Sequence, residues 1–170
     1  MLQGKQISMK FSELTGKRLK WVQPHPFRLK YELRAGDMIV ATLSYPHFSD
    51  TLAIASSDNE TWTFKGGDLR HRTVSIQVSG VETDLAVFNT YLLGGGVLEL
   101  PGGRKYEGVL INRGTGYKFK TEEGEALVTY WNVLTYLRTS GEMYIYPYAK
   151  DLAEISWLAL LGWHLILVTM

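Results

Sequence analysis

The C-terminal segment of the chain is apolar on every side, and this feature constrains the fold most. Residues 155–170 read ISWLALLGWHLILVTM, in which only Ser156, His164 and Thr169 are polar. A helix that is hydrophobic around its whole circumference must be surrounded by protein or by lipid. Either the rest of the chain folds around this helix, or the helix lies in a membrane.

The residues just before this segment predict where the helix begins. The sequence DLAE is typical of a capping box, with Asp151 as the N-cap and Glu154 at the third helical position. Each of these side chains could satisfy a backbone N–H group that the first turn leaves free. We therefore expect a helix over about residues 152–170.

Between about residues 5 and 147 the apolar pattern has a period of two. Phe27, Leu29, Tyr31 and Leu33 alternate with Arg28, Lys30, Glu32 and Arg34. This alternation predicts a strand with its apolar face inward and its charged face outward. A turn at residues 35–37 and a return strand over residues 38–45 would complete a hairpin.

Short apolar runs bounded by Gly, Asn or Pro continue this pattern along the chain. The expected strands cover residues 52–55, 61–65, 72–78, 85–88, 97–100, 106–111, 117–120, 126–131 and 142–147, with less regular pieces near Ile7 and at residues 20–23. The total is eleven or twelve strands, which indicates a meandering antiparallel sandwich or barrel. No linker or exact repeat interrupts the series, so we expect one domain over residues 1–170.

Two surroundings for the C-terminal helix are compatible with the sequence. As a membrane tail anchor, 19 residues from Leu152 would span about 28 Å, just short of a hydrocarbon core of about 30 Å. Glu154, Gly162 and His164 lower the hydropathy of the segment. We favour a mainly β fold in which a closed antiparallel barrel of about 12 strands encloses the helix, because such a barrel has a lumen too wide for its own side chains to fill. His164 is then expected to be a buried neutral imidazole, hydrogen-bonded to a barrel side chain.

Composition and motifs exclude several kinds of catalytic site. The chain has no cysteine and four separated histidines, which excludes disulfides, thiolate metal sites and an HExxH pair. It also has no P-loop and no GxSxG elbow. Glu122, Glu123 and Glu125 flank Gly124 in an expected hairpin turn, where solvated acids are ordinary. We predict no catalytic residue, metal or cofactor. An enzyme with a dispersed site stays an alternative, because such sites are recognised by geometry.

Basic residues are concentrated in the first 30 positions, which carry seven Lys or Arg and one acid, Glu13. The candidates for binding an anionic membrane surface, or another acidic partner, are Lys17, Arg18, Lys20, Arg28 and Lys30. An ordinary solvated face is the alternative. The net charge of +1, and the few aromatics interleaved with these basic residues (Trp21, Phe27 and Tyr31 alone), argue against a nucleic-acid partner. The N-terminus has no apolar run typical of a signal peptide, so we expect a cytoplasmic protein, peripheral at a membrane if it binds lipid.

The strand count, the turns SSDNETWTF and TEEGEALVTYW, and the tail DLAEISWLALLGWHLILVTM together resemble the tubby C-terminal domain superfamily. The short layout is most similar to LURP-one-related and phospholipid-scramblase-like members. The resemblance covers about residues 5–170 and implies a closed barrel around a central helix. It also implies binding of phosphoinositides through basic residues on the barrel surface.

The chain departs from this family in three ways. It has no cysteine cluster for palmitoylation, no membrane-spanning helix separate from the one expected inside the barrel, and no acidic calcium-loop spacing before the last helix. No phosphoinositide-binding position is carried over residue by residue. A protein-interaction scaffold without a small ligand, and a tail-anchored membrane protein, are the alternative functions.

Overall fold

The structure, a computed structural model, describes residues 9–46, 52–66 and 72–169 and consists of strands with a helix near each end. The helices are α1 (Phe11–Leu14) and α2 (Ile155–Thr169), and three short 3-10 turns lie at Pro101–Gly103, Asn112–Gly114 and Pro147–Ala149. The strands are β1 (Arg18–Val22), β2 (Lys30–Ala35), β3 (Met38–Ser44), β4 (Leu52–Ser57), β5 (Glu60–Gly66), β6 (Thr73–Val78), β7 (Asp84–Thr90), β8 (Gly96–Glu99), β9 (Lys105–Ile111), β10 (Gly116–Thr121), β11 (Ala126–Leu134) and β12 (Ser140–Ile145).

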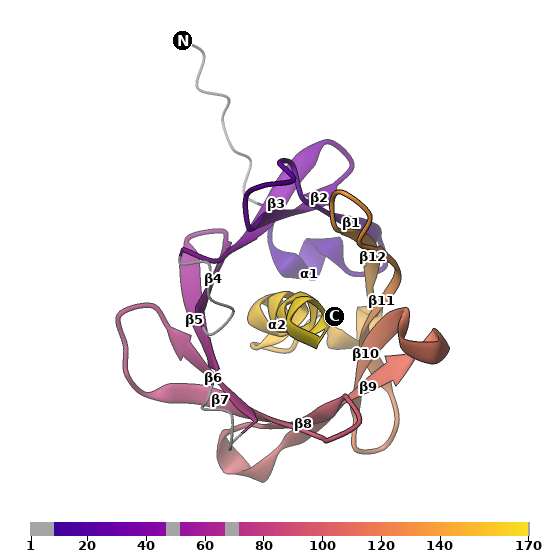
Figure 1. Cartoon of the computed structure of the whole chain (residues 1–170). Coiled ribbons are helices and arrows are strands. Elements are labelled where there is room, and N and C mark those ends of the chain that lie inside the picture. Colours follow the sequence, from indigo (N-terminus) through magenta and orange to yellow (C-terminus); the bar gives the residue numbers. More distant parts are fainter. Residues whose placement is uncertain (1–8, 47–51, 67–71, 170) are drawn as a thin grey trace.

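The strands form one closed barrel (Figure 1). Each strand pairs antiparallel with its neighbours in the chain, and β1 pairs with β12 to close the ring. Leu19 faces Met143 across this closing pair. The predicted fold class, a closed antiparallel barrel of about 12 strands with a C-terminal helix, is confirmed.

Alternation along the strands fills the barrel as the period of two predicts. In β2, Tyr31 and Leu33 are buried, and in β5 Trp62 and Phe64 are buried, while the residues between them face outward. The expectation fails just before β2, where Phe27 is 90% exposed and Leu29 is also exposed.

Two prolines explain why the strand predicted to include Phe27 and Leu29 begins only at Lys30. Pro24 and Pro26 precede Phe27, and a proline offers no N–H group to a strand ladder. The segment before Lys30 is therefore a connection between β1 and β2, and its apolar side chains have no inward face to occupy.

Helix α2 lies inside the ring of strands in Figure 1, and eleven of its 15 residues are buried. Trp163 stacks on Trp21 of β1 with ring centroids 5.3 Å apart. The hydroxyl of Tyr130 in β11 donates a hydrogen bond of 2.5 Å to the carbonyl oxygen of Ala159. Gly162 faces the same tyrosine, and a Cβ atom there would overlap its ring, so glycine is what allows the close approach.

The predicted start of this helix is wrong by three residues. Helix α2 begins at Ile155 rather than near Leu152, and Asp151 lies in a turn without capping it. The carboxylate of Glu154 accepts hydrogen bonds from Arg104 and Tyr106 of the barrel instead of closing a capping box. In the part of the chain that the structure describes, no helix has the length and hydropathy of a membrane span. The strand expected near Ile7 falls outside the described residues.

The meander gives the barrel two distinct ends. Because each strand is antiparallel to the next, alternate connections lie at the same end. Glu154 precedes α2 and contacts Arg104 in the β8–β9 connection, so this end is called the Glu154 end. At the opposite end, Thr169 and Ile166 of α2 share a small hollow with Gly114 and Thr115 of the β9–β10 connection. This opposite end also carries the β7–β8 connection with Leu93 and is called the Leu93 end.

Candidate functional site

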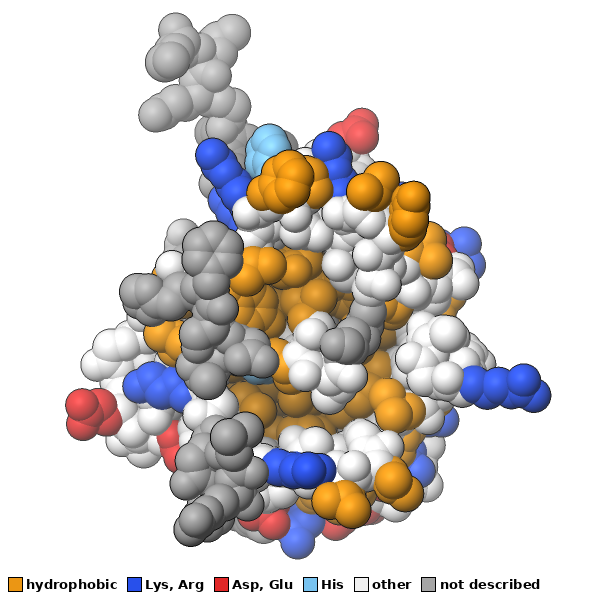
Figure 2. All heavy atoms as spheres, in the orientation of Figure 1, with side chains coloured by type: hydrophobic (Ala, Val, Ile, Leu, Met, Phe, Trp, Pro, Cys, Tyr) orange, Lys and Arg blue, Asp and Glu red, His pale blue; other side chains and the backbone are white. Residues whose placement is uncertain are grey.

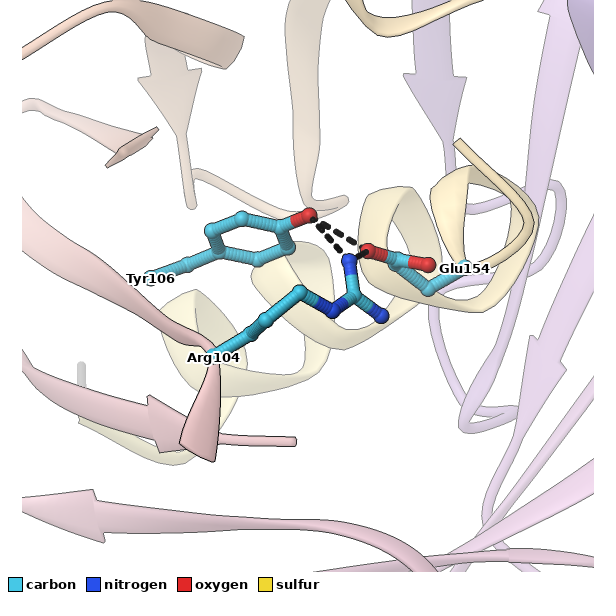
Figure 3. A network of polar contacts seen from close by, with 3 residues as sticks. All are labelled: Arg104, Tyr106 and Glu154. Atoms are coloured by element: carbon cyan, nitrogen blue, oxygen red, sulfur yellow. Dashed lines mark hydrogen bonds and ion pairs between the residues drawn. The ribbon is translucent and has the colours of Figure 1, made fainter. Parts of the chain in front are cut away.

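A cluster of three polar side chains lies at the start of α2 (Figure 3). Arg104 Nη1 lies 2.8 Å from Glu154 Oε1, and the Tyr106 hydroxyl donates to the same oxygen. Burial alone would raise the pKa of Glu154, but the hydrogen bonds from Tyr106 and Arg104 outweigh it, so the pKa is lowered. Burial and the same carboxylate raise the pKa of Tyr106. The cluster is an ionised carboxylate held by two donors, which suits a structural clamp.

The second polar feature of the interior is His164, which is 1% exposed. Its Nδ1 lies 2.7 Å from the Tyr45 hydroxyl, and its ring packs against Phe64. Burial lowers the pKa of His164 to about 4, so the imidazole is neutral near pH 7. The predicted buried histidine with a barrel hydrogen-bond partner is therefore confirmed.

No metal centre is formed by the described residues, among which no group of three or more His, Cys, Asp or Glu lies close enough to hold an ion. Glu122, Glu123 and Glu125 lie exposed in the turn between β10 and β11, as the sequence predicts.

The five predicted basic residues do not gather in one place. Lys17, Arg18 and Lys20 lie at or just before the start of β1, toward the Glu154 end, whereas Arg28 and Lys30 lie toward the Leu93 end. Lys20 faces Arg34 across the β1–β2 pair, so the register places Lys30 about six residues beyond Arg18, or roughly 20 Å along the strands. The candidate patch is split in two.

One acidic side chain, Glu142, lies beside the part of this set on the barrel wall. Arg18 lies 3.7 Å from Glu142 and 5.5 Å from the centroid of the Trp131 ring. Lys20 is directly opposite Glu142 in the β1–β12 register. The outer wall at β1 is therefore a mixed-charge surface of the ordinary kind.

A different set of residues comes together at the Leu93 end. Large apolar side chains are exposed there on three connections, β1–β2, β7–β8 and β11–β12, and at Leu134, the last residue of β11. They are Phe27 (90% exposed), Leu92 (80%), Leu93 (91%), Leu134 (63%), Tyr136 (86%) and Leu137 (77%). Large apolar residues this exposed mark interaction sites when they occur together.

The same end carries four exposed arginines, each from a different connection. They are Arg28, Arg72, Arg113 and Arg138, and none of them forms an ion pair with a described residue. The described parts of the connections at this end contain no Asp or Glu. Figure 2 views the barrel from this end, with hydrophobic and basic side chains around the rim and acidic ones toward the outline.

The Glu154 end has the opposite character. Its connections carry several acidic residues, namely Asp37, Asp58, Glu82, Glu122, Glu123, Glu125 and Asp151. Its exposed apolar side chains are fewer, with Val81 at 48% and Tyr148 at 60%. Among the described residues, the connections of the Glu154 end thus carry more acids and fewer exposed apolar side chains than those of the Leu93 end.

Local hydrogen bonds hold the apolar connections in shape. Gln23 is buried, and its Nε2 donates to the Arg28 carbonyl oxygen (3.0 Å) while its Oε1 accepts from the Thr139 N–H (2.9 Å). This one side chain therefore ties the β1–β2 connection to the β11–β12 connection. Leu137 has a positive φ of 61°, and the Arg138 N–H donates to the Tyr136 carbonyl oxygen at 2.7 Å. Backbone strain of this kind at a leucine is uncommon outside functional sites.

Sequence reasoning missed this end, although two signals were present. The apolar pairs Leu92-Leu93 and Tyr136-Leu137 fall between predicted strands, where turn residues are usually polar. The arginines could not be grouped without the register, because Arg28 and Arg138 are far apart in the chain.

Comparison of the chain with protein-family models, with curated proteins and with solved structures finds no match. The function of the protein is therefore inferred from its own residues.

Proposed function

We propose that the protein is a non-enzymatic, tubby-like barrel that binds anionic phospholipid membranes peripherally through its Leu93 end. The observation that carries the proposal is the set of four exposed arginines that form no ion pair with a described residue, together with the lack of Asp and Glu in the described parts of the connections at this end. The tubby-like part of the proposal comes from the sequence resemblance, which implies a closed barrel with a C-terminal helix such as this one.

Charge at this end favours a membrane surface over a compact ligand. The arginines come from four connections around the ring, so they face one broad surface rather than converge on a single anion. An Arg or Lys near an anionic bilayer contributes about 1 kcal/mol, so four would raise partitioning by up to about a thousand-fold. The Glu154 end, whose connections carry several acids, would be repelled by the anionic membrane. The protein would therefore meet the membrane with its Leu93 end.

Apolar side chains among these arginines support lipid rather than nucleic acid. Nucleic-acid surfaces combine cations with aromatic stacking platforms. Here three of the five most exposed apolar side chains, Leu92, Leu93 and Leu137, are leucines, which have no stacking face; the other two are Phe27 and Tyr136.

Vesicle sedimentation tests the proposal. The protein should pellet with vesicles that contain phosphatidylserine or a phosphoinositide and stay in solution with pure phosphatidylcholine vesicles. Replacing the four arginines together (Arg28→Gln, Arg72→Gln, Arg113→Gln, Arg138→Gln) should weaken binding by about a hundred-fold or more. The matched control, Lys17→Gln with Arg18→Gln and Lys20→Gln, removes cations from the wall and should change binding by less than about three-fold.

Three results would contradict the proposal. One is equal binding to neutral and anionic vesicles. Another is equal binding by the wild type and the variant that lacks the four arginines. The third is a larger loss of binding in the control variant at Lys17, Arg18 and Lys20 than in the four-arginine variant. Soluble inositol phosphate added as a competitor separates recognition of one headgroup from attraction to the charged surface. Concentration-dependent self-association at low salt without vesicle binding would favour a second copy as the partner.

A further inference from the structure

We infer that the barrel stands upright on the membrane, with the tips of its three apolar connections inserted together below the headgroups. The inference rests on the proposed function and adds the depth and the orientation of binding. It follows from where the tips lie around the ring.

The three apolar connections are separated around the barrel mouth. The β1–β2 and β11–β12 connections are neighbours, because β1 pairs with β12, whereas the β7–β8 connection lies across the ring (Figure 1). Their most exposed tips are Phe27, Leu93 and Tyr136. Because these connections lie at the same end and on opposite sides of the ring, a flat surface can contact all three together when it lies across the mouth of the barrel.

Insertion of one tip alone would give a different orientation. The barrel would then tilt and bring part of its mixed-charge wall, such as Glu142 and Arg18 on β12 and β1, toward the bilayer. The upright orientation keeps such wall charges in water and places the four rim arginines at the level of the headgroups.

The chemistry of each tip suits the membrane interface. Phenylalanine and leucine prefer the acyl boundary, and tyrosine sits at the interface with its hydroxyl group in the headgroup layer. Interfacial segments bury their apolar faces to about 5–10 Å. No described carboxylate lies in the connections at this end, so insertion dehydrates no described acid.

Hydrogen bonds and packing hold the three apolar connections in shape in the protein alone, without a membrane. Gln23 bonds the β1–β2 connection to the β11–β12 connection. In the β7–β8 connection, the Tyr91 N–H donates to the Gly95 carbonyl oxygen at 2.9 Å and closes the loop beneath Leu92 and Leu93. A Cβ atom at Gly95 would come within 2.5 Å of the Gly108 carbonyl oxygen, so the loop packs directly on β9. Pre-formed loops lose little conformational entropy on binding.

The absence of cysteine from the chain allows a direct test. Phe27→Cys, Leu93→Cys and Tyr136→Cys, each made alone, can carry a fluorophore whose emission depends on the polarity around it. Val81→Cys, exposed at the Glu154 end, is the matched control. On adding phosphatidylserine vesicles, we expect a blue shift and shielding from aqueous iodide at all three tips, and neither change at position 81.

The outcomes separate the inference from the proposed function. If the protein sediments with anionic vesicles but only one tip is shielded, or none, insertion by three connections is wrong while peripheral binding stands. If position 81 is shielded as strongly as the tips, the upright orientation is wrong. If the protein does not sediment with anionic vesicles at all, both proposals fail.

A variant without labels gives an independent measurement. Phe27→Ser, Leu93→Ser and Tyr136→Ser together should leave the preference for anionic vesicles intact. Binding by this variant should fall steeply with salt, because only the arginine contacts remain. The wild type should keep a fraction that resists salt, and equal salt dependence of the two proteins would overturn the inference.

Discussion

At the Glu154 end of the barrel a buried carboxylate is held by Arg104 and Tyr106, whereas at the Leu93 end four arginines have no acidic partner among the described residues. The apolar side chains divide in the same way, since the largest exposed ones gather at the Leu93 end. The difference indicates that the Glu154 end anchors α2 in the fold, while the Leu93 end is left open for a partner. Substitutions at the first end should therefore change stability, and substitutions at the second should change binding.

The largest expected effect concerns α2 between the two ends and depends on pH. His164 has a pKa of about 4 in the fold, against an ordinary value of 6.5. Between pH 6.5 and 4, His164 is protonated in the unfolded chain but stays neutral in the folded chain. The free energy of unfolding therefore falls as the pH falls from about 6.5 to 4. The difference corresponds to a loss of about 3 kcal/mol. Chemical denaturation across this range measures it.

His164→Gln is the matched variant, because its amide group can form a hydrogen bond with Tyr45 but does not titrate. This variant should lack the part of the pH slope that lies between 6.5 and 4. Glu154, whose pKa is lowered from 4.5, contributes stability that is lost only as the pH falls below that value, so the two titrations separate. Equal slopes in the two proteins would contradict the prediction.

The second effect tests the anchoring role of the Glu154 end. Glu154→Ala leaves the buried Tyr106 hydroxyl without its acceptor and should lower the free energy of unfolding by about 2 kcal/mol. Glu99→Ala is the control, because Glu99 is half-exposed and 3.8 Å from Lys105, and it should cost less than about 0.5 kcal/mol. Denaturation midpoints compare them. An equal loss in both variants would mean that the clamp does not hold α2.

Much of this fold was predictable from the sequence because its two signals are local. The period of two is visible in segments such as Tyr31 to Leu33, and the all-apolar tail demands an enclosing surface. The signals fail where the chain stops following a strand. Phe27 keeps the alternation in sequence, but Pro24 and Pro26 end the ladder before it.

The candidate site was harder to predict because closeness in sequence and closeness in space differ in a meander. Lys17 and Arg28 are eleven positions apart, yet antiparallel pairing sends them toward opposite ends of the barrel. Arg28 and Arg138 are distant in the chain, yet their connections are joined by Gln23. Only the closure of β1 on β12 brings them together.

The third effect concerns the link between the two connections. Gln23→Ala removes three side-chain hydrogen bonds at the Leu93 end and should cost about 1 kcal/mol. It should also speed amide hydrogen exchange in residues 24–29 and 135–139 while leaving the β7–β8 connection unchanged. Gln77→Ala is the matched control, because Gln77 bonds to Glu82 and Asp84 at the other end. If Gln77→Ala loosened residues 135–139 as much, Gln23 would have no special role.

The smallest effect on stability belongs to the apolar tips themselves. Leu92→Ser and Leu93→Ser, made together, remove side chains that are 80% and 91% exposed, so unfolding should change by no more than about 0.5 kcal/mol. Binding to phosphatidylserine vesicles should nevertheless fall by about ten-fold, because the lost apolar area is buried only on the membrane. Val81→Ser at the Glu154 end should alter neither quantity. A loss of stability without a loss of binding would reverse the comparison, since the Leu93 end would then serve the fold rather than a partner.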